Sequence, residues 1–307
     1  MTSYDAVVVG SGPNGLAAAI TLLNAGACVL VLEAKDTPGG GMRTAELTLP
    51  GFRHDVCSAI HPMAAAGSFF SENSIDVTWL QPDVTVAHPL DDGTAGVLHR
   101  SVERTAEAND APRWTTLFRP IVANWEQIDR DILGPTLRVP AHPITLATLG
   151  VRALPSATAV ARWLRSPRAG ALFSGVAAHT NTNLSWPMSS SAGIGLIAAG
   201  HVAGWPCAAG GSQTIAEAMV ARVVELGGEI SCGTPVRTLA DLPPASSYLF
   251  DTTPWQLASI ATDQIPSNVR RAWRRFRPGN GVFTLDYALS EPMQWTNADA
   301  RLAGPVH

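Results

Sequence analysis

One glycine-rich hexapeptide near the start of the chain constrains its fold more than any other feature. The motif, GSGPNG at residues 10–15, lies between two segments of different periodicity. Residues 5–10 form a short apolar run typical of a strand buried on both faces, whereas residues 13–25 have helical spacing and stop at Gly26. A second apolar run at 28–33 completes a strand–helix–strand unit with a right-handed crossover. The sequence therefore predicts an α/β fold with a parallel sheet.

Each position of the motif has a physical role in holding a dinucleotide. Gly10 permits a tight turn, Gly12 lets backbone N–H groups approach a pyrophosphate, and Gly15 lets the helix pack closely on the strand. Pro13 suits the first helical turn, whose N-terminus directs partial positive charge toward phosphates. Glu33, at the end of the second strand, is placed to accept hydrogen bonds from a ribose. The alternative is a glycine-rich turn that binds nothing.

The residues after Glu33 bear on which dinucleotide is bound. The segment PGGGMRT at 38–44 places a glycine doublet six residues after the acid. A nicotinamide-binding unit normally continues into another helix at this point. A chain that instead lays flexible backbone beside the ligand favours FAD.

These segments resemble the flavin amine oxidase and phytoene desaturase superfamily. The similarity rests on GSGPNGL, VLEAKDTPGGGMRT and GFRHDVCSAIHPM within residues 1–62. The last two look most like the phytoene desaturase-related oxidoreductases that include the pyridine nucleotide-disulphide oxidoreductase domain proteins. The segments AHPLDDG, GWPCAAGGSQTIAEAM, LGGEISCGTPV, FDTTP and GVFTLDYAL are similar to that family as well.

The resemblance implies a Rossmann-like FAD-binding domain interrupted by an α+β substrate domain. We expect residues 1–85 and 205–245 in the FAD-binding domain, and 86–204 and 246–307 in the substrate domain. FAD is the implied cofactor. The family often has arginine where this chain has Gly41, and Arg43 is placed to supply that charge. The expected cofactor-binding residues are Gly10, Ser11, Gly12, Pro13, Asn14, Gly15, Glu33, Ala34, Gly40, Gly41, Arg43, Thr44 and Val236.

Two histidines are weak catalytic candidates. His54 and His61 follow the glycine doublet, where the superfamily's chain passes near the flavin ring, so either can position substrate or protonate a flavin atom. The other interpretation is a hydrogen-bonded structural histidine, which also applies to His179 and His201. We expect no essential side-chain base. No HExxH or comparable spacing is present, so no metal is expected.

The four cysteines are far apart and form no CxxC pair. Disulfide reductases need two close cysteines beside the flavin, so that chemistry is not expected despite the family name. We expect four small buried residues in a reducing cytoplasm.

Composition excludes some classes of protein. A net charge of −4 argues against nucleic-acid binding, and 46% hydrophobic with 15% charged residues argues against disorder. The apolar stretch 192–211 holds His201, Pro206 and several glycines, so we expect buried turns and strands there rather than a spanning helix. Five arginines within 270–277 predict a solvated helix face, an anionic-substrate site, a subunit contact in a homo-oligomer, or peripheral membrane contact.

Further elements follow from periodicity and turn residues. The sequence predicts a strand and turn at 75–90, a hairpin at 91–93, and strands at 229–233 and 248–252. It predicts helices at 113–134, 156–165, 167–178 and after Gly211.

The expected activity is that of an FAD-dependent oxidoreductase, which oxidises a C–C or C–N bond of an apolar small molecule by hydride transfer to flavin. Family members continue beyond His307 with a segment that closes the flavin site, so we expect a fragment, a short form, or a second polypeptide that completes the site. The isolated chain should bind FAD weakly, with ADP competing almost as well, and turn over little. The rivals are a non-catalytic nucleotide-binding paralogue or partner subunit and an NAD(P)-dependent dehydrogenase.

Overall fold

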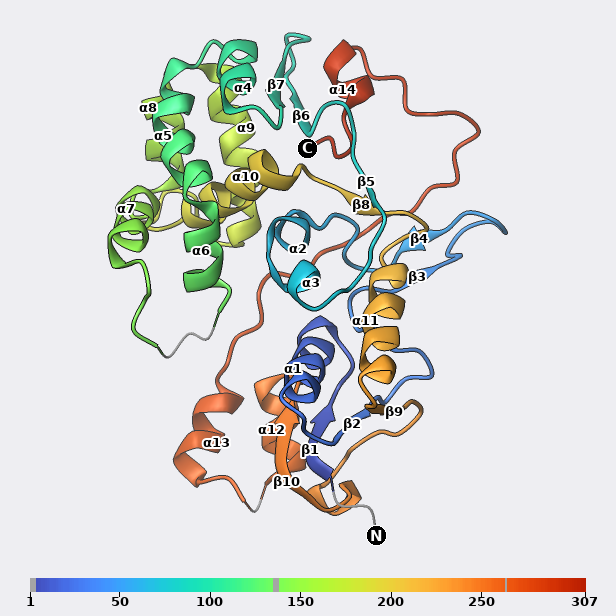
Figure 1. Cartoon of the computed structure of the whole chain (residues 1–307). Coiled ribbons are helices and arrows are strands. Elements are labelled where there is room, and N and C mark those ends of the chain that lie inside the picture. The colour runs from blue at the N-terminus through green and yellow to red at the C-terminus, as the bar shows by residue number, and fades with distance from the viewer. Residues whose placement is uncertain (1–3, 135–137, 263) are drawn as a thin grey trace. The chain divides into compact units, whose positions relative to one another are not determined.

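The computed structural model describes residues 4–134, 138–262 and 264–307 (Figure 1). The chain divides into two compact units, and each comprises segments that are far apart in the sequence. Unit 1 comprises the residues up to 59, 73–78 and 208–288, and unit 2 comprises 60–72, 79–207 and 289–307.

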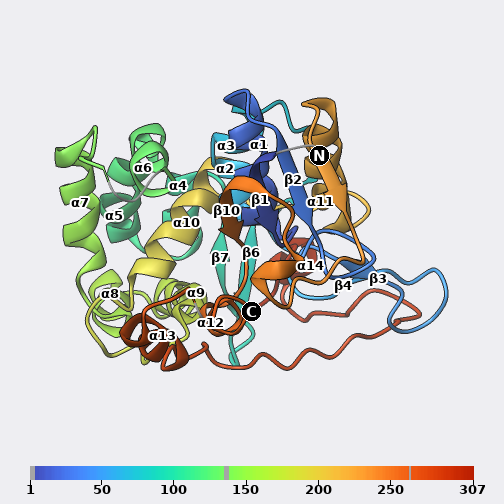
Figure 2. The ribbon, with the colours of Figure 1, turned by 90° about the horizontal axis from the view of Figure 1, so that it is seen from below.

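Unit 1 is built on a four-stranded parallel sheet in the order β10-β1-β2-β9. Figure 2 shows β10, β1 and β2 side by side. The strands are β1 (Tyr4–Val9), β2 (Val29–Leu32), β9 (Glu229–Ser231) and β10 (Ala245–Phe250). Val7 is opposite Leu30 on one side and Tyr248 on the other. Residues 6–9 of β1 and all of β2 are apolar and buried, because both of their faces are covered.

Two helices, α1 and α11, pack against this sheet. α1 (Pro13–Asn24) packs on β1 and β2, and α11 (Gln213–Glu225) packs on α1 and β9. Val7, Val9, Leu30 and Leu32 form a second apolar cluster with Val236 and Phe250 beside it. Unit 1 also holds the antiparallel pair β3 (Thr44–Ala45) and β4 (His54–Asp55), the contacting helices α12 (Pro254–Ile260) and α13 (Ser267–Arg274), and a 3-10 turn (Leu239–Asp241).

The predicted strand–helix–strand unit is confirmed, and the fold is α/β. The expected domain boundary at residue 245 lies at the start of β10. Because β10 pairs with β1, residues 246–250 are part of the parallel sheet of unit 1, and unit 1 extends to 288. Residues 246–288 had been expected in the substrate domain.

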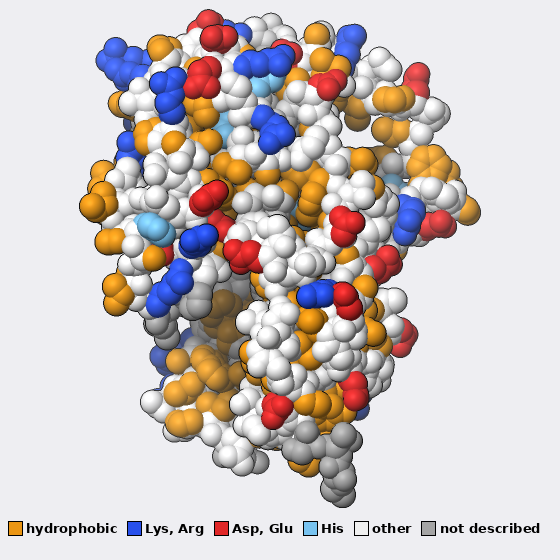
Figure 3. Space-filling model, in the orientation of Figure 1, with side chains coloured by type: hydrophobic (Ala, Val, Ile, Leu, Met, Phe, Trp, Pro, Cys, Tyr) orange, Lys and Arg blue, Asp and Glu red, His pale blue; other side chains and the backbone are white. Residues whose placement is uncertain are grey.

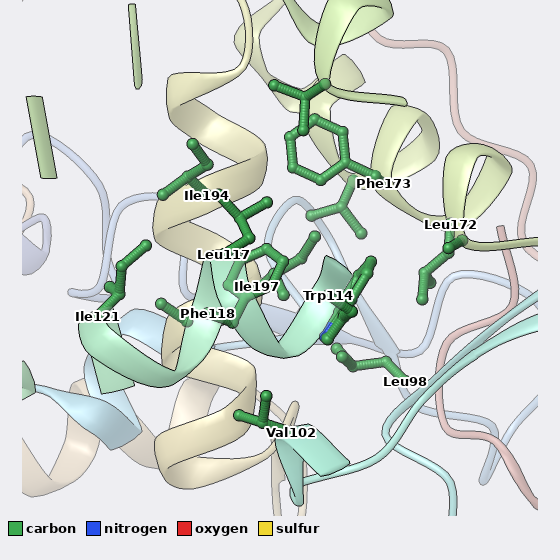
Figure 4. Close-up of a cluster of buried hydrophobic side chains, with 14 of the residues drawn as sticks. Leu98, Val102, Trp114, Leu117, Phe118, Ile121, Leu172, Phe173, Ile194 and Ile197 are labelled. Carbon is green, nitrogen blue, oxygen red and sulfur yellow. The ribbon is translucent and has the colours of Figure 1, made fainter. Parts of the chain in front are cut away.

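Unit 2 is mainly helical and encloses the larger apolar core. Trp114, Phe118, Phe173 and Ile197 are fully buried within it (Figure 4). Its helices are α2 (Pro62–Ala66), α3 (Phe69–Glu72), α4 (Val102–Ala108), α5 (Pro112–Ala123), α6 (Trp125–Ile132), α7 (Pro143–Ala153), α8 (Ala157–Leu164), α9 (Pro167–Ala177), a 3-10 turn (Ala178–Thr180), α10 (Ser191–Ala203) and α14 (Ala298–Leu302).

The prediction of turns and strands for residues 192–211 is wrong, because most of that stretch is helix α10. Its glycines allow close packing rather than chain reversal. A Cβ at Gly193 would lie 2.9 Å from the Cβ of Ala177 on α9, and one at Gly200 would lie 3.2 Å from the Trp205 ring. The gain from packing α10 against α2, α5 and α9 outweighs the helix propensity that glycine loses.

The hairpin predicted at residues 91–93 is confirmed. β6 (Val86–Pro89) pairs antiparallel with β7 (Ala95–Leu98), and Gly93 in the connecting turn has a φ of 82°. Two short strands, β5 (Trp79–Leu80) and β8 (Cys207–Ala208), lie where the chain passes between the units.

The expectation of four buried cysteines is wrong. Cys28, Cys57 and Cys232 are exposed, Cys207 is half-buried, and all four are free thiols. Cys28 precedes β2 instead of lying within it, which explains its exposure.

Among the helices of the described ranges, none is by itself long and apolar enough to cross a membrane. The pair α7 and α8, bent by 87°, meets the same criteria of length and composition when its two helices are taken together.

His201 in α10 is a structural histidine, and it makes unit 2 sensitive to acid. Its ring accepts a hydrogen bond from Trp114 Nε1 at 3.0 Å and lies 3.0 Å from the Arg100 carbonyl oxygen through Nδ1. Burial lowers the pKa of His201 from 6.5 to about 4. As pH falls from about 6.5 to 4, His201 therefore becomes protonated in the unfolded chain but stays neutral in the folded chain. Stability therefore decreases over that window, by about 3 kcal/mol for a shift of this size.

A comparison with His201→Gln tests this. We expect the unfolding free energy of the variant, measured by urea titration at several pH values, to depend less on pH between 4 and 6.5. An identical slope in both proteins would assign the acid sensitivity to other groups.

Candidate nucleotide-binding site

The glycine-rich loop passes from β1 into α1 in a conformation that only small residues permit. Gly10 has a φ of 104°, and a Cβ on it would lie 2.6 Å from the carbonyl oxygen of Asp251. A Cβ on Gly15 would lie 2.2 Å from the Gly10 carbonyl oxygen. Pro13 occupies the first turn of α1, as predicted. The loop thus brings the N-terminus of α1 against the carboxyl end of the sheet, where dinucleotides bind in such folds.

The N–H groups of this turn are only partly used. Ser11 N donates to Glu33 Oε2 at 3.0 Å, and Gly15 N donates to Asp251 Oδ2 at 2.9 Å. Within the described part of the chain, the N–H groups of Gly12 and Asn14 have no hydrogen-bond acceptor. Two donors at a helix N-terminus are the groups that hold a phosphate.

Glu33 is buried at the end of β2 and held in place from two directions. Its Oε2 accepts from Ser11 Oγ at 2.5 Å, and its Oε1 accepts from Lys35 N at 2.9 Å. Burial by itself raises the pKa of Glu33, but the hydrogen bonds from Ser11 and from backbone N–H groups outweigh it and lower the pKa below its ordinary value. Glu33 is therefore ionised at neutral pH, and its carboxylate has acceptor positions to spare for a ribose.

The second glycine segment lies directly against the first. Gly39 N donates to the Ser11 carbonyl oxygen at 3.0 Å, and a Cβ on Gly40 would lie 2.9 Å from the Gly12 Cα. Residues 34–61 contain no helix, only β3 and β4. The chain therefore lays irregular backbone beside the phosphate loop, as the sequence predicts for FAD rather than for a nicotinamide cofactor.

A pocket of about 720 Å³ opens at this edge of unit 1. It gathers many of the residues expected to bind a cofactor. Those that line it are Gly10, Ser11, Gly12, Pro13, Glu33, Ala34, Gly40, Gly41 and Val236.

Four expected residues do not line the pocket. Asn14 and Gly15 belong to the first turn of α1. Arg43 donates through Nε to the Gly40 carbonyl oxygen at 2.8 Å, which steadies the second glycine segment. Thr44 donates through its hydroxyl to Asp55 Oδ1 at 2.6 Å and accepts from Gln213 N at 2.9 Å, so it connects β3 to the start of α11.

Sequence reasoning missed Asp251, a charged residue in the pocket. It follows β10, and its carboxylate accepts the Gly15 N–H. The sequence feature that could have identified Asp251 is the motif FDTTP, which follows an apolar run. Because β10 lies next to β1, the carboxyl ends of both strands meet at the same edge of the sheet, and the residue after β10 comes to lie at the glycine loop. Lys35, Arg237 and Trp255 also line the pocket and were not expected.

Neither weak catalytic candidate lines this pocket. His54 lies in β4 of unit 1, with Nε2 2.7 Å from Thr48 Oγ1 and Nδ1 3.7 Å from Asp286. His61 precedes α2 in unit 2, with its ring centroid 6.2 Å from that of Trp79. The arginines at 270–277 begin in α13, where Arg270 donates to the Thr262 carbonyl oxygen.

Comparisons of the sequence with known proteins agree with this geometry. Residues 8–71 match the model of an NAD(P)-binding Rossmann-like domain. The chain is 32% identical over 136 residues to a subunit of limonene dehydrogenase from Castellaniella defragrans, which covers 43% of this chain and 24% of that protein. It is 28% identical over 246 residues to hydroxyneurosporene desaturase of Rhodobacter capsulatus, which covers 73% of this chain and 48% of that protein. The matched region thus spans less than half of either relative.

Solved structures share the fold at low sequence identity. An oxidoreductase from Methanosarcina mazei superposes with a TM-score of 0.57 at 16% identity, covering 88% of this chain and 64% of that one. Putrescine oxidase superposes with a TM-score of 0.53 at 17% identity, covering 89% and 63%. The chain is thus similar in sequence to a phytoene desaturase-related enzyme and to a dehydrogenase subunit, as its motifs suggest, and it shares its fold with flavin-dependent oxidoreductases.

Proposed function

We propose that this chain binds FAD in the pocket of unit 1 and belongs to an enzyme that oxidises a C–C or C–N bond of an apolar small molecule. The observation that carries the proposal is the cradle formed by the two glycine segments, where a Cβ at Gly12 or Gly40 would occupy the space beside the loop. The relatives include a desaturase and one component of a dehydrogenase, which favours an oxidation.

The chain's own residues fit the ADP half of FAD. The free N–H groups of Gly12 and Asn14 would donate to the pyrophosphate, and the positive end of the α1 dipole would stabilise its charge. Glu33 would accept from the ribose hydroxyls, and Val236 offers apolar contact to the adenine.

Bound FAD supplies hydride acceptance, which is chemistry that amino-acid side chains lack. The role of unit 1 is to bind and orient the cofactor. We propose no essential side-chain base, because neither His54 nor His61 lines the pocket.

An NAD(P)-dependent dehydrogenase is the second candidate, favoured by the name of the domain model that residues 8–71 match. The absence of a helix in residues 34–61 argues against it. A non-catalytic nucleotide-binding protein is the third. Titration of the purified chain with FAD, NADPH and ADP, followed by absorption spectroscopy of the bound fraction, separates the first candidate from the second, and turnover separates an enzyme from a non-catalytic protein. FAD binding with flavin bands supports the proposal, and NADPH binding without FAD binding would contradict it.

Replacement of Glu33 by Gln tests the ribose assignment. We expect FAD affinity to fall about tenfold or more, because a charge-assisted hydrogen bond is worth about 1–3 kcal/mol. Glu217→Gln, on the exposed side of α11, is the matched control and should bind as the parent does. Isothermal titration gives both constants. Equal affinities for the two variants would mean that Glu33 only orders the loop through Ser11.

A further inference from the structure

A carboxylate lies directly beside the glycine-rich loop of unit 1. The Asp251 side chain is half-buried, and its Oδ2 accepts the Gly15 N–H at 2.9 Å. A Cβ added to Gly12 would lie 2.7 Å from the same oxygen. The negative charge of Asp251 is therefore next to the Gly12 N–H that we assign to a phosphate of the cofactor.

The positive side chains of the pocket do not neutralise this carboxylate. Lys35 and Arg237 line the same pocket, and both are exposed. Among the residues that the structure describes, no ion pair includes Asp251, Lys35 or Arg237. In the same ranges, Gly15 N is the one hydrogen-bond donor to the Asp251 carboxylate. A bound phosphate would therefore meet a negative charge that has no counter-ion among these residues.

The backbone keeps Asp251 at the loop. Its N–H donates to the Val9 carbonyl oxygen at 2.8 Å, and a Cβ added to Gly10 would lie 2.6 Å from its carbonyl oxygen. A rotation of the side chain thus moves the carboxylate only locally. The hydrogen bond to Gly15 does not itself require a charge, because the amide oxygen of an asparagine could accept the same N–H.

We propose that Asp251 is a specificity-determining residue, whose charge disfavours terminal phosphates relative to the pyrophosphate diester of a dinucleotide. The inference rests on the proposed binding of FAD at this loop. Each phosphate of FAD carries about one negative charge, whereas the terminal phosphate of ADP carries about one charge more at neutral pH. Repulsion by Asp251 therefore increases from FAD to ADP. ADP should accordingly compete with FAD less well than its contacts alone would allow.

Other acidic side chains of unit 1 lack this position. Figure 3 shows them lying singly in the region where Figure 1 draws α1 and α11. Exposed charges of this kind are screened by water and salt, so they contribute little to binding. Asp5 is a matched comparison for Asp251, because its Oδ2 also accepts a backbone N–H, from Cys28 at 2.8 Å. It lies near the start of β1, at the opposite end of the strand from the glycine loop.

Titration of the purified chain with adenosine, FAD and ADP tests the proposal. Asp251→Asn removes the charge and keeps an acceptor for the Gly15 N–H. We expect the FAD affinity to rise about tenfold, and the ADP affinity to rise at least about threefold more than that. Adenosine has no phosphate, so its affinity should stay the same. Added salt should reduce both gains. Asp5→Asn should bind all three ligands as the parent does.

A second variant separates the charge from the anchoring of the loop. Asp251→Ala removes both the charge and the acceptor for the Gly15 N–H, so its Tm should fall below that of Asp251→Asn. The ratio of the ADP affinity to the FAD affinity should nevertheless shift as it does in Asp251→Asn. This ratio depends on the charge and is independent of the fraction of chain that is folded.

The outcomes distinguish this proposal from the assignment of FAD. If the parent and Asp251→Asn bind ADP equally well, Asp251 only anchors the loop and the proposal is overturned. Weaker FAD binding by Asp251→Asn would overturn it as well, because the carboxylate would then accept a hydrogen bond from the cofactor. A gain for ADP without FAD binding in either protein would support the role of Asp251 and contradict the assignment of FAD. Failure of both proteins to bind any nucleotide would overturn both.

Discussion

Gly12→Val should abolish nucleotide binding while the chain stays folded. A Cβ at Gly12 would point at the Asp251 carboxylate, which lines the same pocket, so a bulky side chain there should hold the phosphates away from the N–H groups of Gly12 and Asn14. Loss of two charge-assisted hydrogen bonds corresponds to a fall in affinity for FAD and ADP of about 100-fold or more. The fold should survive, because a Cβ at Gly12 meets only the Asp251 carboxylate, at 2.7 Å, and that side chain can rotate.

The neighbouring glycines make the test selective. At Gly15 the obstructing atom is the backbone oxygen of Gly10, so a substitution there would disturb the fold as well as the site. Gly195→Val in α10 is the matched control, because nothing lies within 4 Å of the added Cβ. Isothermal titration gives the affinity, and far-ultraviolet circular dichroism gives the fold. If Gly12→Val bound FAD as the parent does, the phosphate-loop assignment would be wrong.

The strand–helix–strand unit could be predicted from the sequence because its signals are local. The loop needs small residues within six positions, and Glu33 follows a short apolar run that ends the unit. The glycine loop, Glu33 and Gly40 therefore all lie within residues 10–40. The pocket contains nine of the thirteen residues expected to bind cofactor, and eight of these nine lie within residues 10–41, which reflects this locality.

Asp251 could not be found in the same way. It enters the site because β10 pairs with β1, and that pairing joins residues more than two hundred positions apart. Strand order is a tertiary choice that no local pattern encodes. The same reason explains why the domain boundary at 245 was placed at the start of β10 rather than after unit 1 ends.

Helix α10 shows the limit of propensity in unit 2. Its glycines and His201 are locally typical of loops, yet each has a tertiary partner. The lack of a side chain at Gly193 lets α9 pack closely, and the lack of one at Gly200 leaves room for the Trp205 ring. His201 accepts a hydrogen bond from the Trp114 indole N–H. Packing of this kind overrides the local preference for turns. The cysteines were expected to be buried, yet three of them are exposed. A single small residue belongs to no periodic pattern, so the sequence does not determine whether it is buried.

Trp114→Ala should be the most damaging substitution in unit 2. The indole is fully buried, lies 4.6 Å from the Phe118 ring between centroids, and satisfies His201 Nε2. Its loss leaves a large cavity, which costs about 3–5 kcal/mol, and an unpaired ring nitrogen, which costs about 1–3 kcal/mol more.

Trp186→Ala removes the same side chain from a site where it is 61% exposed, so it separates burial from the chemistry of the indole. We expect this control to cost less than about 1 kcal/mol, as surface substitutions do. Guanidinium unfolding, followed by circular dichroism, compares the two variants with the parent. Unit 2 should lose its helical signal at lower denaturant only in Trp114→Ala. If both variants unfolded at the same midpoint, the Trp114 cluster would not be the core that holds α5 and α10 together.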